Sequence, residues 1–133
     1  AFGEHVIAKE VEEAMQLAVK ETGASINEFT VAPQITPKGN ELPYHEWFVE
    51  FENQPTDMDK FIGILDSSLQ KQNSYYFDLI EGKVLQTLKV TSITEGGFNA
   101  YMKSIGKLGG QNKVQRLAND RKVADGLSSF KKN

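Results

Sequence analysis

The residues with the clearest capacity for chemistry lie in the stretch GKLGGQNKVQR, which runs from Gly106 to Arg116. Glycines let backbone N–H groups approach a ligand closely, a lysine adds a point charge, and an arginine presents a planar fork to a phosphate or carboxylate. The stretch is not a Walker A loop, which needs Ser or Thr after Gly-Lys, and it contains no GxGxxG fingerprint. It is an anion-binding loop, a helix C-cap at Gly109 with charged neighbours, or both at once, and composition alone favours the C-cap.

Charge is divided unevenly along the chain. Residues 1–100 contain 16 Asp and Glu, 7 Lys and no Arg, whereas residues 101–133 contain 8 Lys and Arg and 2 Asp. A basic segment on an acidic domain is either a local anion site or a solvated tail. Because the net charge is −3 and the chain has only two arginines, we expect no nucleic-acid partner.

The composition also restricts metal, redox and membrane chemistry. The chain has no cysteine, which excludes disulfides and thiolate metal sites and fits a cytoplasmic location. Neither His5 nor His45 has a metal-ligand spacing such as HExxH, so we expect no metal site. His45 is in phase with Trp47 in a predicted strand, which favours a hydrogen-bonded core or edge histidine. No apolar run approaches the roughly 18 residues that span a bilayer, so we expect no membrane association.

Hydrophobic spacing predicts the elements that must position these residues. In the first half we expect a helix near 7–22 and a hairpin of two strands, 29–35 and 44–52. The strand 44–52 alternates, so one face should be buried and its glutamates should lie on a solvated face: Glu46, Glu50 and Glu52.

The second half predicts a helix with Thr56 as its N-cap, a short uncertain segment at 73–83 and a third strand at 84–93. A helix should follow Gly96-Gly97, with Ile105 on its buried face, and Asn119 should cap a last helix. This order predicts an α+β fold in which a small, mostly antiparallel or mixed sheet is flanked by helices. At 133 residues the chain is expected to form one domain, residues 1–133.

Several stretches, taken as an ordered series, resemble the auxin-responsive acyl-acid amido synthetases, the Gretchen Hagen family within the adenylate-forming superfamily. The start AFGEHVI is similar to the family's entry into its C-terminal domain. Gln115 stands where the family has Pro before its Arg, and Ile80 where many relatives have a basic residue, which fits a bacterial-type member better than a plant hormone-conjugating one. The stretches that carry the resemblance are LDSSLQKQNSYY (65–76), VLQTLKV, GGFNAYM and LGGQNKVQR.

The resemblance implies a fragment of an enzyme that activates a carboxylic acid with ATP and magnesium and transfers the acyl group to an amine. This chain would be its lid-like C-terminal domain, inactive alone, without a bound cofactor in isolation, and closing over an N-terminal adenylation domain that binds the nucleotide and a small carboxylic acid. On matching positions, Lys113 would be catalytic, contacting phosphate or acyl carboxylate oxygens. The expected cofactor-binding residues, which shape the loop or anchor it, are Gly109, Gly110, Gln111 and Arg116.

A second hypothesis stays open at the level of sequence. The chain could be a free-standing, non-catalytic α+β module that binds a ligand or oligomerises through a sheet face or an edge strand, with its basic end serving solubility. The parent open reading frame discriminates between the two, because only the ligase requires a nucleotide-binding domain upstream.

Overall fold

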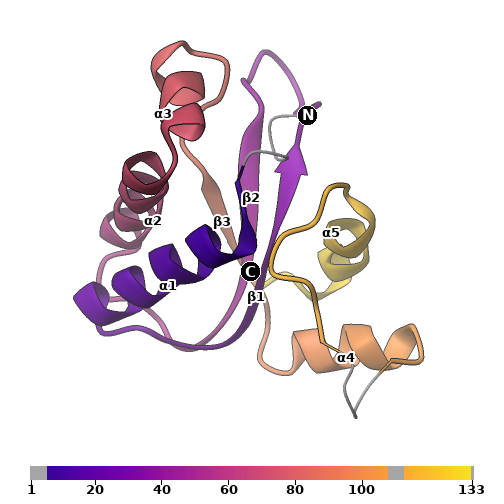
Figure 1. Ribbon diagram of the computed structural model, residues 1–133. Helices are drawn as coiled ribbons and strands as arrows, with labels where there is room; N and C mark the ends of the chain where they lie inside the picture. The colour runs from indigo at the N-terminus through magenta and orange to yellow at the C-terminus, as the bar shows by residue number, and fades with distance from the viewer. Residues whose placement is uncertain (1–5, 108–112, 133) are drawn as a thin grey trace.

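The computed structural model describes residues 6–107 and 113–132. Five helices and three strands make up most of this part of the chain, and the last helix continues into a 3₁₀ turn at Ser128–Phe130 (Figure 1). In chain order they are α1 (Ala8–Thr22), β1 (Ser25–Gln34), β2 (Tyr44–Asn53), α2 (Met58–Gln72), α3 (Ser74–Glu81), β3 (Lys89–Ser92), α4 (Gly97–Ser104) and α5 (Lys122–Leu127).

The three strands form one sheet with β2 in the middle. β1 pairs with β2 antiparallel, as the predicted hairpin requires, and the register runs from Ser25 opposite Asn53 to Gln34 opposite Tyr44. β3 pairs with the other edge of β2 in parallel. A parallel neighbour needs a long crossover, which α2 and α3 supply here. The predicted α+β fold with a mixed sheet is confirmed.

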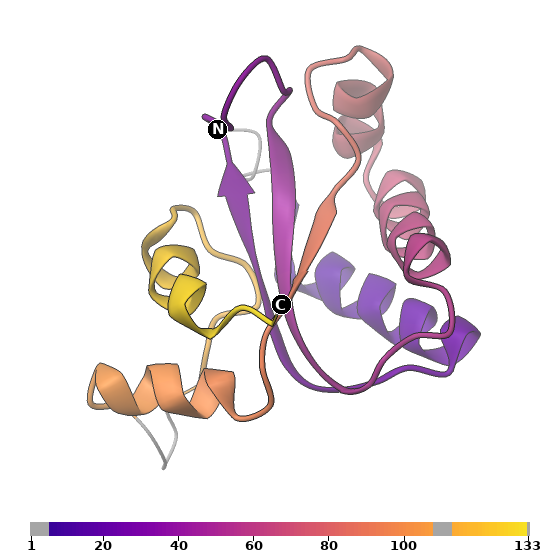
Figure 2. The ribbon, with the colours of Figure 1, turned by 180° about the vertical axis from the view of Figure 1, so that it is seen from behind.

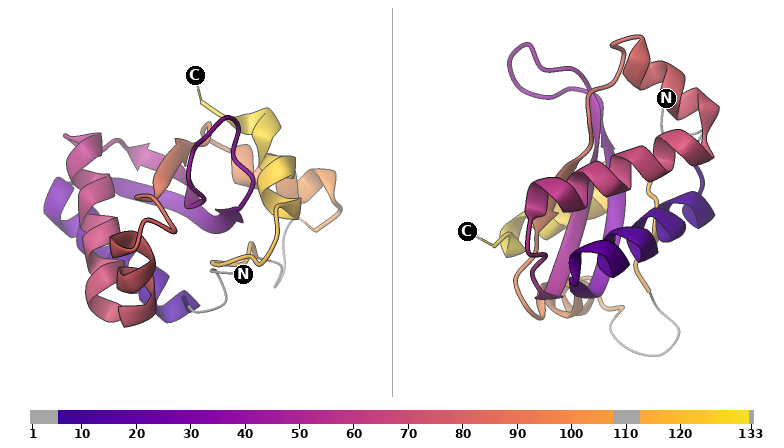
Figure 3. Two further views of the ribbon diagram at one scale, coloured as in Figure 1. Left: turned by 90° about the horizontal axis from the view of Figure 1, so that it is seen from above. Right: turned by 90° about the vertical axis from the view of Figure 1, so that its left-hand side faces the viewer.

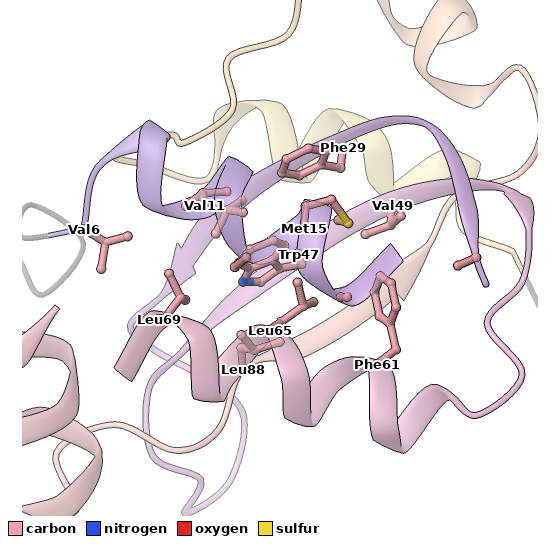
Figure 4. Close-up of a cluster of buried hydrophobic side chains, with 14 of the residues drawn as sticks. Val6, Val11, Met15, Phe29, Trp47, Val49, Phe61, Leu65, Leu69 and Leu88 are labelled. Carbon is pink, nitrogen blue, oxygen red and sulfur yellow. The ribbon is translucent and has the colours of Figure 1, made fainter. Parts of the chain in front are cut away.

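One face of the sheet is covered by α1 and α2, which lie side by side across the strands (Figure 3, right). Val11, Ala14, Met15 and Ala18 recur at helical spacing along α1 and are all buried, so the amphipathic stripe explains both the helix and its packing. Trp47 of β2 is fully buried beneath them, and its ring stacks on that of Phe29 at a centroid distance of 5.8 Å (Figure 4).

The opposite face is covered by α4 and α5, which lie on the other side of the strands from α1 and α2 (Figures 1 and 2). Phe48, between Trp47 and Val49 in β2, points into this second core and is fully buried. Other buried members are Ala32, Ile93, Phe98, Tyr101, Met102, Ala118, Ala124 and Leu127. The domain therefore has three layers, and β2 is buried on both faces.

The second core overturns the prediction that the glutamates of β2 lie on a solvated face. Glu46 and Glu50 are only 7% and 6% exposed, whereas Glu52, near the end of the strand, is exposed as expected. Both buried carboxylates are paired: Glu46 with Thr91 and Arg121, Glu50 with donors described below. Pairing offsets the cost of removing a carboxylate from water.

Several predicted element boundaries move, and β1 begins at Ser25, before the strand expected at 29–35. β3 is confined to Lys89–Ser92 because residues 84–88 turn back on α3, and the carbonyl oxygen of Leu79 accepts hydrogen bonds from the N–H groups of Val84 and Leu85. The N-cap of α2 is Asp57 rather than Thr56, since its carboxylate accepts the N–H of Lys60 at 3.1 Å.

The end of the chain also differs from the prediction. α5 begins at Lys122 after Arg121, not at an Asn119 cap. Ile105 follows the last residue of α4 and is 46% exposed, so it does not join the buried face of that helix. The α4 stripe therefore consists of Phe98, Tyr101 and Met102.

Candidate functional site

The backbone from Gln115 to Ala118 runs along the outer edge of β1. The N–H of Val31 donates to the carbonyl oxygen of Arg116 at 2.9 Å, and the N–H of Ala118 donates to the carbonyl oxygen of Val31 at 2.8 Å. Val31 and Leu117 form a short parallel bridge, and the hydroxyl of Thr30 donates to the carbonyl oxygen of Gln115. The sequence that contains the predicted site residues is thus attached to the edge of the sheet.

A cleft of about 460 Å³ opens where this segment faces α4. Lys113 and Arg116, the two predicted site residues in the described ranges, both line it. Sequence analysis did not assign a functional role to the other lining residues, of which Lys107 and Val114 lay in the stretch it singled out. They are Asn27, Glu28, Glu50, Phe98, Asn99, Met102, Lys107 and Val114. The predicted Gly109, Gly110 and Gln111 lie outside the described residues.

Lys113 is an available cation of this cleft. Its side chain is exposed and forms no salt bridge with any residue in 6–107 or 113–132. Lys107, also exposed, lines the same cleft and a neighbouring hollow of about 350 Å³ against Tyr101 and Val123. Two unneutralised ammonium groups at one opening favour an anionic ligand.

Arg116 is placed differently, because its guanidinium contacts groups of its own domain. Nη1 pairs with the carboxylate of Glu28 and donates to the carbonyl oxygen of Phe29 at 2.8 Å, while Nε lies 3.2 Å from Oε1 of Glu12. The guanidinium carbon is 4.6 Å from the centre of the Phe29 ring, a distance typical of a cation–π contact. Arg116 thereby ties the segment to both α1 and β1.

Arg121 is likewise paired with an acidic residue of the first hundred. Its Nη1 lies 2.9 Å from Oε1 of the buried Glu46, and its guanidinium carbon lies 5.7 Å from the ring of Phe48. Both arginines thus hold the basic C-terminal segment on the acidic part of the domain. The basic C-terminal segment and the acidic first hundred residues are thus joined by ion pairs through the two arginines. The cleft lysines, Lys107 and Lys113, take no part in these ion pairs.

Comparison with known proteins gives the family. The model of the GH3 family C-terminal domain matches residues 9–122, which include every strand and the segment that carries Lys113 and Arg116. The chain belongs to the GH3 family. The Gretchen Hagen resemblance seen in the sequence is confirmed at this level.

Two solved structures are similar to this GH3 C-terminal domain. "GH3.15 acyl acid amido synthetase" aligns with a TM-score of 0.72 and 14% identity over 93% of this chain and 24% of that one. "AtGH3.15 acyl acid amido synthetase in complex with 2,4-DB" aligns with a TM-score of 0.69 and 16% identity over 94% and 23%. At this identity the likeness shows the fold, and this chain spans about a quarter of the length of either protein. The comparison with curated proteins gives no match.

The GH3 C-terminal domain also contains a buried polar cluster away from the cleft. Tyr76 donates its hydroxyl hydrogen to Asp66, which also accepts the N–H of Leu88 at 3.3 Å and the side-chain amide of Gln70 at 2.7 Å. Burial and the neighbouring carboxylate raise the pKa of Tyr76 far above its ordinary value. The cluster joins α2, α3 and the segment before β3, so its role is to hold these elements together.

His45 packs against this cluster, with its ring stacked on Tyr76 at 5.5 Å. It is 1% exposed, and burial lowers its pKa to about 4. The prediction was a hydrogen-bonded core or edge histidine, and its core position is confirmed. At neutral pH the imidazole is uncharged. Because His45 is buried and does not line the cleft, it is not a candidate base for chemistry there.

The described residues contain neither a metal-binding cluster nor a membrane-spanning helix. Within 6–107 and 113–132 no group of three or more His, Asp or Glu side chains is arranged to hold a metal ion. None of the helices there is long and apolar enough to cross a bilayer. Of the groups named by the family resemblance, the cleft lysines suit the phosphates of ATP, and no described cluster suits magnesium.

Proposed function

We propose that this chain is the C-terminal domain of an ATP-dependent acyl-acid amide ligase. Such an enzyme adenylates a carboxylic acid and transfers the acyl group to an amine, for which an amino acid is the expected acceptor. The observation that carries the proposal is the family match across residues 9–122. The two similar structures are both named acyl acid amido synthetases, and one is in complex with 2,4-DB.

In this proposal Lys113 stabilises the negative charge that is redistributed during adenylation. The carboxylate oxygen attacks the α-phosphorus of ATP, and pyrophosphate leaves with the electron pair of the broken P–O bond. The exposed Nζ of Lys113 donates hydrogen bonds to the oxygens of the reacting phosphate or carboxylate, which stabilises negative charge as it is redistributed. Lys107, at the same opening, adds to the positive potential that attracts the anions.

The missing part of the site belongs to an N-terminal adenylation domain. That partner would hold most of the nucleotide, its magnesium and the acyl group, and this domain would close over them as a lid. A lid of this kind adds its catalytic groups to those of the other domain, so the domain alone is expected to be inactive. A cytoplasmic, bacterial-type enzyme without nucleic-acid or membrane partners remains the expectation from the sequence.

The experiment compares the full-length protein with the same protein lacking residues 1–133 of this sequence. Carboxylate-dependent pyrophosphate release and amide formation are measured with ATP, a panel of carboxylic acids and a mixture of amino acids. We expect both activities in the full-length protein and their loss on deletion. The proposal is contradicted if pyrophosphate release by the full-length protein does not depend on the carboxylic acid, or if deletion leaves both activities unchanged. The non-catalytic module is then the better hypothesis.

A further inference from the structure

Arg116 lines the same cleft as Lys113, yet its strongest contacts are with acidic groups. An anion in the cleft would have to displace the carboxylate of Glu28 from Nη1 to reach that nitrogen, and Glu12 occupies Nε from the other side. Charge-assisted hydrogen bonds of this type are roughly twice as strong as neutral ones. The arrangement therefore favours Arg116 as an internal anchor over Arg116 as a ligand of phosphate.

Lys113 lies three residues before this anchor, and those residues are neither helix nor strand. Three residues reach at most about 10 Å, so the location of Arg116 limits where the Lys113 ammonium can lie. Backbone hydrogen bonds from Thr30 and Val31 already attach residues 115–118 to β1. The ion pair between Glu28 and Arg116 also fixes the orientation of this segment at the wall of the cleft, which both residues line.

We infer that Glu28 is a positioning residue for Lys113: by holding Arg116 it fixes where the Lys113 ammonium lies in the cleft, and Arg116 itself does not bind phosphate. The inference rests on the proposed function, since it gives Glu28 and Arg116 a part in the adenylation that Lys113 assists. It replaces the cofactor-binding role expected for Arg116 from the family resemblance.

The test is a set of variants of the full-length protein, assayed for kcat and for the KM of ATP in carboxylate-dependent pyrophosphate release. Glu28→Gln removes the charge that holds the guanidinium, and Arg116→Lys keeps the charge but loses the fork. Each is made in the parent and in the Lys113→Ala background, with a melting temperature for every variant. Glu13→Gln, which removes an exposed carboxylate of α1 outside the cleft, is the charge control.

Displacing a catalytic group by a fraction of an ångström lowers rates strongly, so Glu28→Gln and Arg116→Lys should each lower kcat about tenfold in the parent. In the Lys113→Ala background each should change kcat by less than about twofold, because no ammonium remains to be positioned. Glu13→Gln should leave kcat and KM unchanged.

Three results overturn the inference while leaving the proposed function standing. A tenfold loss that persists in the Lys113→Ala background means that Arg116 acts directly. Tighter ATP binding in Glu28→Gln, paired with weaker binding in Arg116→Lys, identifies Arg116 as a phosphate ligand. A lower melting temperature with unchanged kcat means that the pair only stabilises the fold. A parent protein without carboxylate-dependent pyrophosphate release, in contrast, overturns the proposed function and this inference together.

Discussion

The carboxylate of Glu50, in the middle of β2, accepts a hydrogen bond at 3.1 Å from the backbone N–H of Phe98 in the first turn of α4. Its other oxygen accepts the N–H of Gly96 at 3.2 Å and the side-chain amide of Asn27 at 3.0 Å. A negative charge is also favoured at a helix N-terminus by the helix dipole. One buried carboxylate thus joins β1, β2 and α4, the elements that form the walls of the cleft around Lys113.

Glu50→Ala should lower the free energy of unfolding by about 2 kcal/mol, because it leaves the buried N–H of Phe98 without an acceptor and removes the hydrogen bonds from Gly96 and Asn27. The measurement is urea denaturation followed by circular dichroism. Glu52→Ala, an exposed glutamate on the same strand, is the control and should change stability by less than about 0.5 kcal/mol. Equal effects of the two variants would show that Glu50 does not hold α4.

Arg121→Met should destabilise the domain by about 3 kcal/mol, because it leaves the buried carboxylate of Glu46 without a cationic partner. The double variant Glu46→Gln with Arg121→Met removes both charges and should recover most of this loss. A double-mutant cycle on the free energy of unfolding measures the coupling. Additive effects would mean that the pair contributes nothing to the packing of the C-terminal segment.

His45 should make the domain sensitive to mild acid. Its pKa is lowered by burial from 6.5 to about 4, so between those values the unfolded chain binds a proton that the folded domain excludes. The resulting stability is fully present above pH 6.5, falls as the pH drops towards 4, and amounts to at most about 3 kcal/mol.

His45→Phe, which can keep the stacking on Tyr76, should remove this part of the pH dependence. Urea unfolding at pH 7.5, 5.5 and 4.5 tests it, with the difference between parent and variant cancelling the titration of carboxylates elsewhere. If both proteins lose stability in parallel between pH 7.5 and 4.5, His45 is not the group responsible.

Two glycines within helices should respond to alanine in opposite ways. A Cβ on Gly126 of α5 would lie 2.3 Å from Cε1 of Tyr101, whereas a Cβ on Gly63 of α2 would meet no atom within 4 Å. Gly126→Ala should therefore cost about 2 kcal/mol by overpacking, despite alanine's better helix propensity. Gly63→Ala should add about 0.5–1 kcal/mol. Thermal unfolding measures the stability of both variants. Stabilisation by both substitutions would contradict the close approach of α4 and α5.

The parts of the fold that were predicted are those whose pattern is local. The stripe of α1 and the Trp47 face of β2 each follow from a dozen residues or fewer, and for both the pattern predicts side chains that face a core. Gly126 shows the limit of this reasoning. Glycine disfavours a helix, and nothing in the sequence around Gly126 signals that the ring of Tyr101 packs over it in α5.

The second sheet face could not be predicted for a related reason. Alternating glutamates in a strand have the same pattern whether they face water or buried donors, and the donors for Glu46 and Glu50 come from β3, α4 and the segment before α5. The partners become visible only when the chain is folded. Tertiary pairing here overrides what the polarity of the residues indicates.

For the candidate site, the family resemblance gave roles to Lys113 and Arg116, which lie three residues apart, and both line one cleft. The difference between them could not be seen in the sequence. Glu12 and Glu28 lie far from Arg116 along the chain, and only the packing of α1 and β1 against its segment shows that its guanidinium is engaged while the Lys113 ammonium is exposed.

The most direct test of the account is the rate of carboxylate-dependent pyrophosphate release by the full-length protein carrying Lys113→Ala. Lys103→Ala, an exposed lysine of α4 outside the cleft, is the matched control. If Lys113 stabilises charge in the transition state, its removal should lower kcat about a hundredfold with the melting temperature unchanged, while Lys103→Ala keeps the parental rate. Equal, parental rates in both variants would contradict the role assigned to this domain's cleft.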